Sequence, residues 1–139
     1  MVAEDPDSTV SALIFDTDIL VWVLRRHLGA VAFVERVPVA ERKISAISYL
    51  ELLRGCRDLE ELNRLSKHVM SKFGEVLHLS ESITESASRL MERFALAHRP
   101  DVSDVIIAAT ALGLDETVAT GNIKHFDFIP GLSLKRFRG

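Results

Sequence analysis

The feature that most constrains the fold of this 139-residue chain is a series of short apolar runs separated by longer segments of helical periodicity. Each run is shorter than an ordinary helix and is bounded by polar residues. Runs of this kind are typical of strands that are buried inside a parallel sheet. We therefore expect strands over residues 12–15, 43–47, 75–79 and 116–120, with a possible fifth strand over residues 132–134.

The segments between these runs repeat their apolar residues at helical spacing. Residues 105–112 are apolar on all sides, which predicts that this helix is buried. Ser48 is followed by Glu51 in a capping-box pattern, so we expect a helix to begin at Ser48 and to end near Gly55. The expected helices cover residues 19–26, 30–37, 48–55, 59–73, 80–98 and 101–113.

Short strands that alternate with helices define the α/β class. We expect a three-layer α/β/α sandwich with a mainly parallel four- to five-stranded sheet. A chain of 139 residues corresponds to one domain, and its 47% hydrophobic content is enough to build a packed core. We assign this single domain to residues 12–139 and expect residues 1–11 to form a flexible leader.

Composition and charge exclude several classes of protein. Cys56 is the sole cysteine, which excludes an intrachain disulfide and a multi-cysteine zinc site. We expect no membrane span and no signal peptide, and therefore a cytoplasmic protein. The net charge of −3 argues against binding to nucleic acid by bulk electrostatics. Residues 123–139 are nevertheless basic, which fits a phosphate-bearing substrate, an acidic partner or a solvated tail.

Three carboxylates are predicted to meet at one edge of the sheet. Asp16 follows the first strand, Glu51 is expected on the first turn of the helix after the second strand, and Asp104 opens the buried helix before the fourth strand. Ligands of open α/β sheets bind at the carboxyl ends of the strands. Carboxylates that crowd together repel one another unless a cation neutralises them, and oxygen ligands favour Mg²⁺ or Mn²⁺. A cation held in this way commonly serves phosphate chemistry.

Other polar residues are predicted near the same edge of the sheet. Asn122, His125 and Asp127 follow the fourth strand and are candidates for a further metal ligand. Hydroxyl and carboxyl groups close to the three acids are expected to support them by holding water or by orienting the carboxylates. These supporting residues are Asp18, Ser48, Asp101 and Thr120.

Each of these acids also has a purely structural interpretation. Asp16 fits the N-cap of the first helix, and Glu51 fits the capping partner of Ser48. Asp101 and Asp104 fit a second capping box at the start of the buried helix. The functional interpretation therefore depends on the shared position of the acids at strand ends, and not on any one of them.

Four segments of the chain resemble, in order, the sequence blocks of PIN-domain nucleases. The first two are LIFDTDIL at residues 13–20 and ISAISYLELLRG at residues 44–55. The other two are SDVIIAATA at residues 103–111 and ATGNIKHF at residues 119–126. The compact length is similar to that of the VapC toxins of type II toxin–antitoxin pairs. The resemblance implies a PIN-like fold and an endoribonuclease that depends on Mg²⁺ or Mn²⁺.

Carried over residue by residue, the resemblance makes Asp16, Glu51 and Asp104 the catalytic, metal-binding acids. It implies a VapB-type antitoxin whose C-terminal segment fills the acidic cleft, a homodimer, and a hetero-oligomer of toxin and antitoxin. The RNA substrate is expected to enter as a single-stranded loop, because duplex RNA hides its phosphates from a small cleft. Candidate contacts to RNA or antitoxin are Arg25, Arg54, Arg57 and Lys124.

Two alternatives remain open at this point. The sequence Asp16-Thr17-Asp18 also fits the D-x-D motif of haloacid-dehalogenase-type phosphatases, although the acidic block that those enzymes need downstream is missing. The second alternative is a non-catalytic binding module with a PIN-like fold. Its support is the fourth acidic position of the resemblance, where Asn122 stands in the block, His125 occupies a place that is often acidic, and Asp127 follows.

Overall fold

The computed structural model describes residues 12–139, so the expected leader at residues 1–11 lies outside the described part. The strands are β1 (Leu13–Phe15), β2 (Arg42–Ser45), β3 (Glu75–Leu77), β4 (Thr117–Thr120) and β5 (Ser133–Arg136). The helices are α1 (Thr17–Leu24), α2 (Leu28–Glu35), α3 (Ala46–Arg54), α4 (Leu59–Lys72), α5 (Glu81–His98) and α6 (Val102–Leu114). Two short 3₁₀ helices complete the set: η1 (Val39–Glu41) and η2 (Ile123–His125).

The five strands form one sheet in the order β3-β2-β1-β4-β5, and every pair of neighbours is parallel. The chain builds outward from β1 in one direction through β2 and β3, and then returns to the other side of β1 with β4. The boundary between β1 and β4 is therefore the switch point at which α/β proteins commonly bind ligands. In register, Phe15 pairs with Ala119 and Thr120 pairs with Arg136, so these strands end at a common edge.

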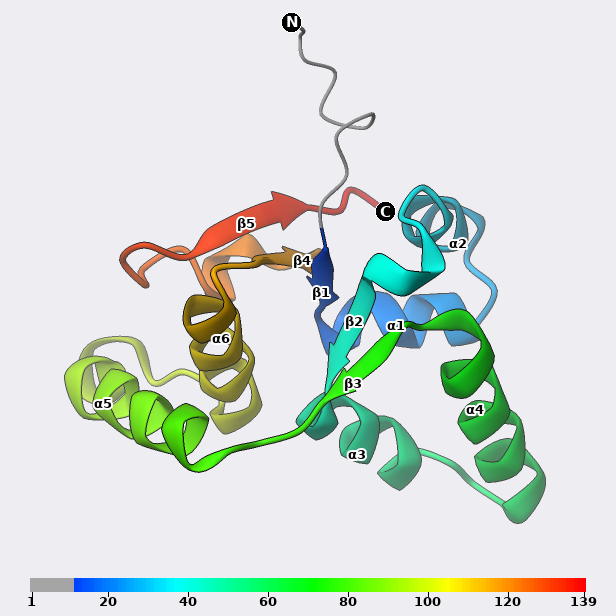
Figure 1. Ribbon diagram of the computed structural model, residues 1–139, viewed down its shortest axis with the longest axis horizontal. Coiled ribbons are helices and arrows are strands. Elements are labelled where there is room, and N and C mark those ends of the chain that lie inside the picture. Colours follow the sequence, from blue (N-terminus) through cyan, green and yellow to red (C-terminus); the bar gives the residue numbers. More distant parts are fainter. Residues whose placement is uncertain (1–11) are drawn as a thin grey trace, which may run out of the picture.

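Helices cover both faces of the sheet, which confirms the predicted α/β/α sandwich. Helices α1 to α4 lie on one side of the sheet and α5 and α6 on the other (Figure 1). Phe15 and Ile19 are buried in the first of the two layers, whereas Ile14, Ile107 and Val118 are buried in the second. The apolar α6 contributes a long run of buried residues, as its composition predicts.

The predicted start of α3 is wrong. The helix begins at Ala46, and its N-cap is Ser45, whose hydroxyl accepts a hydrogen bond from the backbone N–H of Ile47 at 3.2 Å. Ser48 is instead fully buried inside the helix, where Thr17 contacts it. Glu51 consequently lies beyond the first turn of α3 and is exposed, so it is not the capping partner of Ser48.

The capping box predicted for α6 is also absent. Asp101 occupies the N-cap position, but its side chain makes no capping hydrogen bond. Asp104 is therefore not one half of a reciprocal cap, and its carboxylate remains available for another role. By contrast, Ser80 caps α5, because its hydroxyl accepts a hydrogen bond from the backbone N–H of Ile83 at 3.2 Å.

Candidate active site

Asp16 stands at the carboxyl end of the central strand β1 and caps α1. Its Oδ1 accepts a hydrogen bond from the backbone N–H of Thr17 at 2.7 Å. Its Oδ2 accepts a second hydrogen bond, also of 2.7 Å, from the hydroxyl of Thr120 at the end of β4. The residue is 4% exposed, so its negative charge is poorly solvated. Both the structural and the functional interpretation of Asp16 are therefore compatible with its position.

The pKa of Asp16 depends on its burial and on the charges around it. Its pKa is raised to about 7, chiefly by burial, then by the negative charge of Asp18 and more weakly by that of Asp104. The hydrogen bonds from Thr120 and Thr17 act in the opposite direction, because they stabilise the ionised carboxylate. Asp18 and Asp104 therefore lie close enough to Asp16 for their charges to disfavour its ionised form.

Asp104 lies on the first turn of α6, where it is 8% exposed. Burial is the main cause that raises its pKa to about 6, and the nearby His125 opposes this shift. The charges of Asp101, Glu51 and Asp18 raise the pKa further. His125 Nδ1 lies 3.3 Å from Asp104 Oδ2, so this histidine belongs to the site, as one of the three candidates after the fourth strand.

Glu51 reaches the site from α3 through a pair of hydroxyl groups. The hydroxyl of Thr17 lies 3.0 Å from Glu51 Oε1 and 2.8 Å from the hydroxyl of Ser48. Ser48 is fully buried, whereas Glu51 is exposed. The first turn of α1 is thereby joined to α3, and the Glu51 carboxylate is held on the side of the cluster that faces solvent.

Asp18 contributes an oxygen atom that lacks a partner. Its Oδ2 accepts a hydrogen bond of 3.1 Å from the backbone N–H of Gly121, directly after β4. Its Oδ1 is buried and receives no hydrogen bond within the described residues. An unpaired buried acceptor is costly, and a cation would satisfy it.

The donor set fits a hard divalent cation. Its candidate ligands are carboxylate oxygens, which Mg²⁺ and Mn²⁺ prefer, whereas zinc sites are usually built from nitrogen and sulfur. Within residues 12–139, no three His, Cys, Asp or Glu side chains stand together at metal-binding distance. A cation would give the buried, unpaired oxygen of Asp18 a partner and would lower the raised pKa of Asp16.

Other residues predicted for the site lie at its margin. Asn122 and Asp127 are exposed, and neither side chain forms a hydrogen bond or ion pair with the acids in the described part of the chain. Arg25 and Arg57 line a groove that begins at Thr17 and Glu51. Arg54 and Lys124 are exposed and do not line that groove.

Two residues of the site were missed by the sequence analysis as functional candidates, Thr17 and Gly121. Thr17 stands between the two acids of the Asp16-Thr17-Asp18 motif, and this position was the available signal. Gly121 follows Thr120 directly, and a Cβ atom at Gly121 would lie 3.0 Å from Asp18 Oδ2. No local sequence pattern predicts this close approach of Gly121 to Asp18.

The structure is that of an α/β/α protein with a parallel sheet and with acidic side chains near the switch point between β1 and β4. The chain belongs to the PIN-domain family, because the family model described as "PIN domain" matches residues 13–129. This membership places the D-x-D sequence in a PIN domain and removes the phosphatase alternative.

Curated relatives from Mycobacterium tuberculosis support the family assignment. The chain is 31% identical over 122 residues to Ribonuclease VapC19, a match that covers 86% of this chain and 95% of the relative. It is 32% identical over 120 residues to Ribonuclease VapC10, with coverage of 82% and 85%. These VapC proteins confirm the resemblance that the four sequence blocks predicted.

Solved structures share the fold over nearly their whole length. A toxin–antitoxin complex from Klebsiella pneumoniae matches with a TM-score of 0.70 and 30% identity, and the match covers 88% of this chain and 95% of that chain. VapBC2 from Rickettsia felis, bound to a promoter DNA fragment, matches with a TM-score of 0.78 and 24% identity, and the match covers 91% of this chain and 99% of that chain.

None of the helices between residues 12 and 139 combines the length and hydropathy needed to cross a lipid bilayer.

Proposed function

We propose that this chain is a Mg²⁺- or Mn²⁺-dependent endoribonuclease that serves as the toxin of a toxin–antitoxin pair. The observation that supports the proposal is the placement of Asp16, Asp18 and Asp104 at the carboxyl edge of the sheet, where the charges of Asp18 and Asp104 raise the pKa of the buried Asp16 and one buried oxygen of Asp18 lacks a hydrogen-bond partner within the described residues. Relatives named ribonuclease and similar structures of toxin–antitoxin complexes support the same activity and role.

Asp16, Glu51 and Asp104 would hold the cation, with Asp18 next to them and His125 against Asp104. A divalent cation in such a site supplies a hydroxide at neutral pH and stabilises the charge that develops on a phosphodiester.

The chain's own residues prepare this site in three ways. Thr120 and the N–H of Thr17 fix both oxygens of Asp16 and favour its ionised form. The hydroxyl of Thr17 orients Glu51, while the N–H of Gly121 holds one oxygen of Asp18 and leaves the other free. These contacts keep the acids pre-arranged, so less reorganisation is needed when RNA binds.

The partners follow from the same proposal. A VapB-type antitoxin would cover the acidic cleft with its C-terminal segment and place a basic side chain against the acids. We also propose a homodimer, a hetero-oligomer with the antitoxin, and a cytoplasmic location. The RNA would be single-stranded at the site, with Arg25, Arg54, Arg57 and Lys124 as candidate contacts to RNA or antitoxin.

The enzyme activity is tested with purified protein and a panel of structured RNAs that carry single-stranded loops. We expect cleavage with Mg²⁺ or Mn²⁺, none with a chelator, and none by the Asp104→Asn variant. Asp115→Asn is the matched control, because Asp115 follows the opposite end of α6 in a left-handed conformation that asparagine tolerates. Equal cleavage by Asp104→Asn and the wild-type protein would contradict the assignment of the acids.

The role as a toxin needs a separate test in cells. Expression of the wild-type chain should arrest growth, and expression of Asp104→Asn should not. Co-expression of the product of the neighbouring reading frame should reverse the arrest. RNA binding without metal-dependent cleavage would instead support the non-catalytic binding module.

A further inference from the structure

A groove of about 850 Å³ lies beside the acidic site between α1, α3 and α4. Thr17 and Glu51 form part of its wall, so the groove reaches the Glu51 side of the acidic site. From there it continues past Cys56, at the end of α3, to His68 on α4. Its apolar lining includes Leu52 and Leu65.

The charge of the groove is opposite to that of the acidic site. Four arginines line it, from three separate segments of the chain, against two glutamates. The lining arginines are Arg25, Arg26, Arg57 and Arg64, and the glutamates are Glu51 and Glu61. All four arginines are exposed. A positively charged groove next to a nuclease centre is the common way to hold the backbone of a single strand.

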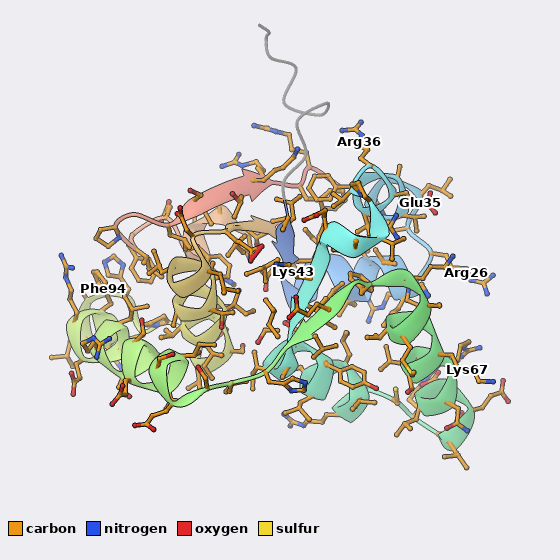
Figure 2. All side chains as sticks on the ribbon, viewed as in Figure 1. Arg26, Glu35, Arg36, Lys43, Lys67 and Phe94 are labelled. Carbon is orange, nitrogen blue, oxygen red and sulfur yellow. The ribbon has the colours of Figure 1, made fainter. Side chains whose placement is uncertain are left out.

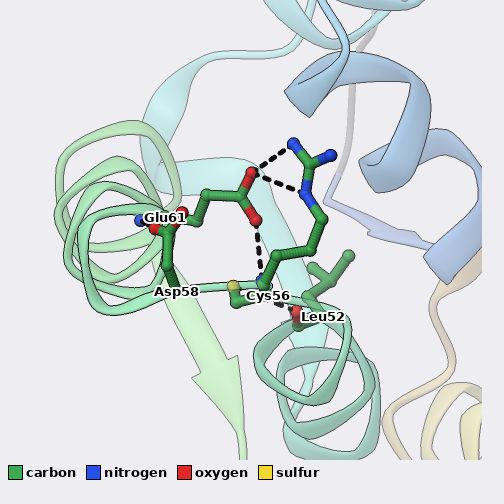
Figure 3. Close-up of polar contacts among 5 residues, drawn as sticks. Leu52, Cys56, Asp58 and Glu61 are labelled. Carbon is green, nitrogen blue, oxygen red and sulfur yellow. Dashed lines mark hydrogen bonds and ion pairs between the residues drawn. The ribbon is translucent and has the colours of Figure 1, made fainter.

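The four arginines are not equally available to a ligand. Glu61 clamps Arg57: its Oε2 accepts from Arg57 Nη2 at 2.6 Å and from Nε at 3.1 Å (Figure 3). The backbone N–H of Arg57 donates to the other oxygen of Glu61 at 2.8 Å. Arg25 and Arg64, in contrast, form no ion pair within the described residues.

We propose that this groove binds the backbone of single-stranded RNA next to the acidic site, with Arg25 and Arg64 contacting phosphates and Glu61 restraining Arg57. The inference rests on the proposed ribonuclease activity, which requires a phosphodiester chain to leave the acids along some path. The groove offers that path because it is continuous with Thr17 and Glu51 and carries an excess of positive charge. Leu24, which also lines the groove and is 38% exposed, provides an apolar surface there.

The proposal predicts opposite effects from neighbouring substitutions on one helix. Removing the cation in Arg64→Ala should weaken binding, whereas Glu61→Gln should strengthen binding because it frees the guanidinium of Arg57. Lys67→Ala is the matched control, since Lys67 lies on α4 outside the groove lining and extends away from the body (Figure 2). Lys67→Ala also removes one positive charge, so it corrects for bulk electrostatics.

Binding is measured with a fluorescent oligouridylate in a chelator, so that no cleavage takes place. Arg25→Ala and Arg64→Ala should each lower the affinity several-fold and reduce the slope of log K against log salt by about 0.7. Glu61→Gln should tighten binding and steepen the slope. Lys67→Ala should match the wild-type protein, and thermal unfolding of each variant checks that it is folded.

Cys56 gives a second measurement that locates the ligand. It is the chain's one cysteine and lines the groove, so bound oligouridylate should slow its alkylation, and added salt should restore the rate. An acidic peptide that protects Cys56 while oligouridylate does not would overturn the proposal in favour of a protein ligand. Equal affinities of Arg64→Ala, Arg25→Ala and Lys67→Ala for the oligonucleotide would overturn it as well.

The chelator separates this inference from the proposed function. If arginine-dependent binding occurs but Mn²⁺ produces no cleavage, the endoribonuclease proposal fails and the groove remains an RNA site. If cleavage occurs but depends on none of these arginines, the activity stands and the groove proposal fails.

Discussion

The hydroxyl of Thr17 lies 3.0 Å from Glu51 Oε1 across 34 residues of sequence, and it also contacts the hydroxyl of Ser48 at 2.8 Å. Thr17 is the residue between the two acids of the first sequence block, and its backbone N–H simultaneously holds Asp16. One residue therefore connects the acid at the end of β1 to the acid on α3. This connection makes Thr17 a positioning residue of the proposed active site.

Thr17→Val is expected to reduce RNA cleavage about tenfold, because a hydrogen bond to a charged group contributes roughly 1.5 kcal/mol. Glu51 would lose its orienting partner while the backbone cap of Asp16 remains. A higher Mn²⁺ concentration for half-maximal cleavage should accompany the loss, together with a lower thermal stability, because the buried Ser48 hydroxyl loses its contact with Thr17. Thr17→Ser should restore both properties, since it retains the hydroxyl; a serine variant as impaired as the valine variant would contradict this role.

Thr120→Val is expected to destabilise the protein by about 1–3 kcal/mol, because it removes a buried hydrogen bond. Thr120 donates to Asp16 Oδ2 at 2.7 Å and accepts from the N–H of Asn122 at 2.9 Å. This donation lowers the pKa of Asp16, so its removal should raise that pKa further. Denaturant unfolding and a carboxyl NMR titration measure the two effects.

Thr110→Val is the control for this substitution. Thr110 is equally buried, but its hydroxyl donates to the carbonyl of Ile106 within α6 at 2.8 Å and touches no acid. The control should leave the titration of Asp16 unchanged. A matching shift of the Asp16 pKa in both variants would show that the contact with Thr120 is not its cause.

The sequence predicted the parts of the site that depend on local order along the chain. Asp16 could be placed because the short apolar run before it defines where β1 ends. Asp104 could be placed because the wholly apolar segment after it defines where the buried helix α6 begins. Parallel pairing then brings strand ends to one edge, and this is a general property of the fold. The composition of β5 was weaker evidence, yet its pairing with β4 confirms a fifth strand.

The remainder depends on contacts that have no local pattern. Ser45 and Ser48 are both plausible caps, and the choice follows from the register of β2, in which Ser45 still pairs with Leu77 of β3. The Gly121 N–H reaches Asp18 across 103 residues. The basic groove likewise arises where three helices pack, so no single segment encodes it.

The stability of the metal-free protein should fall as the pH rises from about 4 to about 7. The pKa of Asp16 is about 7 and that of Asp104 about 6 in the folded chain, against an ordinary value of 3.8. Between these values the folded state binds more protons than the unfolded state, so the free energy of unfolding decreases with increasing pH. The total loss is on the order of 3 kcal/mol after allowing for partial solvation.

Thermal unfolding in a chelator, at pH values from 5 to about 8, measures this effect. Asp16→Asn and Asp104→Asn should each flatten the profile and raise the melting temperature at the alkaline end. Mg²⁺ should stabilise the wild-type protein most at alkaline pH, where both carboxylates are ionised. A wild-type melting temperature that rises with pH over this window would show that the acids are not held in a repulsive, buried arrangement.

Gly121→Ala should impair cleavage because a Cβ atom there would lie 3.0 Å from Asp18 Oδ2 and 3.7 Å from the ring of Phe137. The carboxylate must then move away from the Gly121 N–H that holds it, and the affinity for Mn²⁺ should fall. Gly113→Ala is the control, since a Cβ atom on this exposed face of α6 meets nothing within 4 Å. Alanine should stabilise that helix by up to about 1 kcal/mol. Calorimetric titration with Mn²⁺, followed by cleavage assays at saturating Mn²⁺, distinguishes lost affinity from lost catalysis. An unchanged Mn²⁺ affinity of Gly121→Ala would show that Asp18 does not contribute to cation binding.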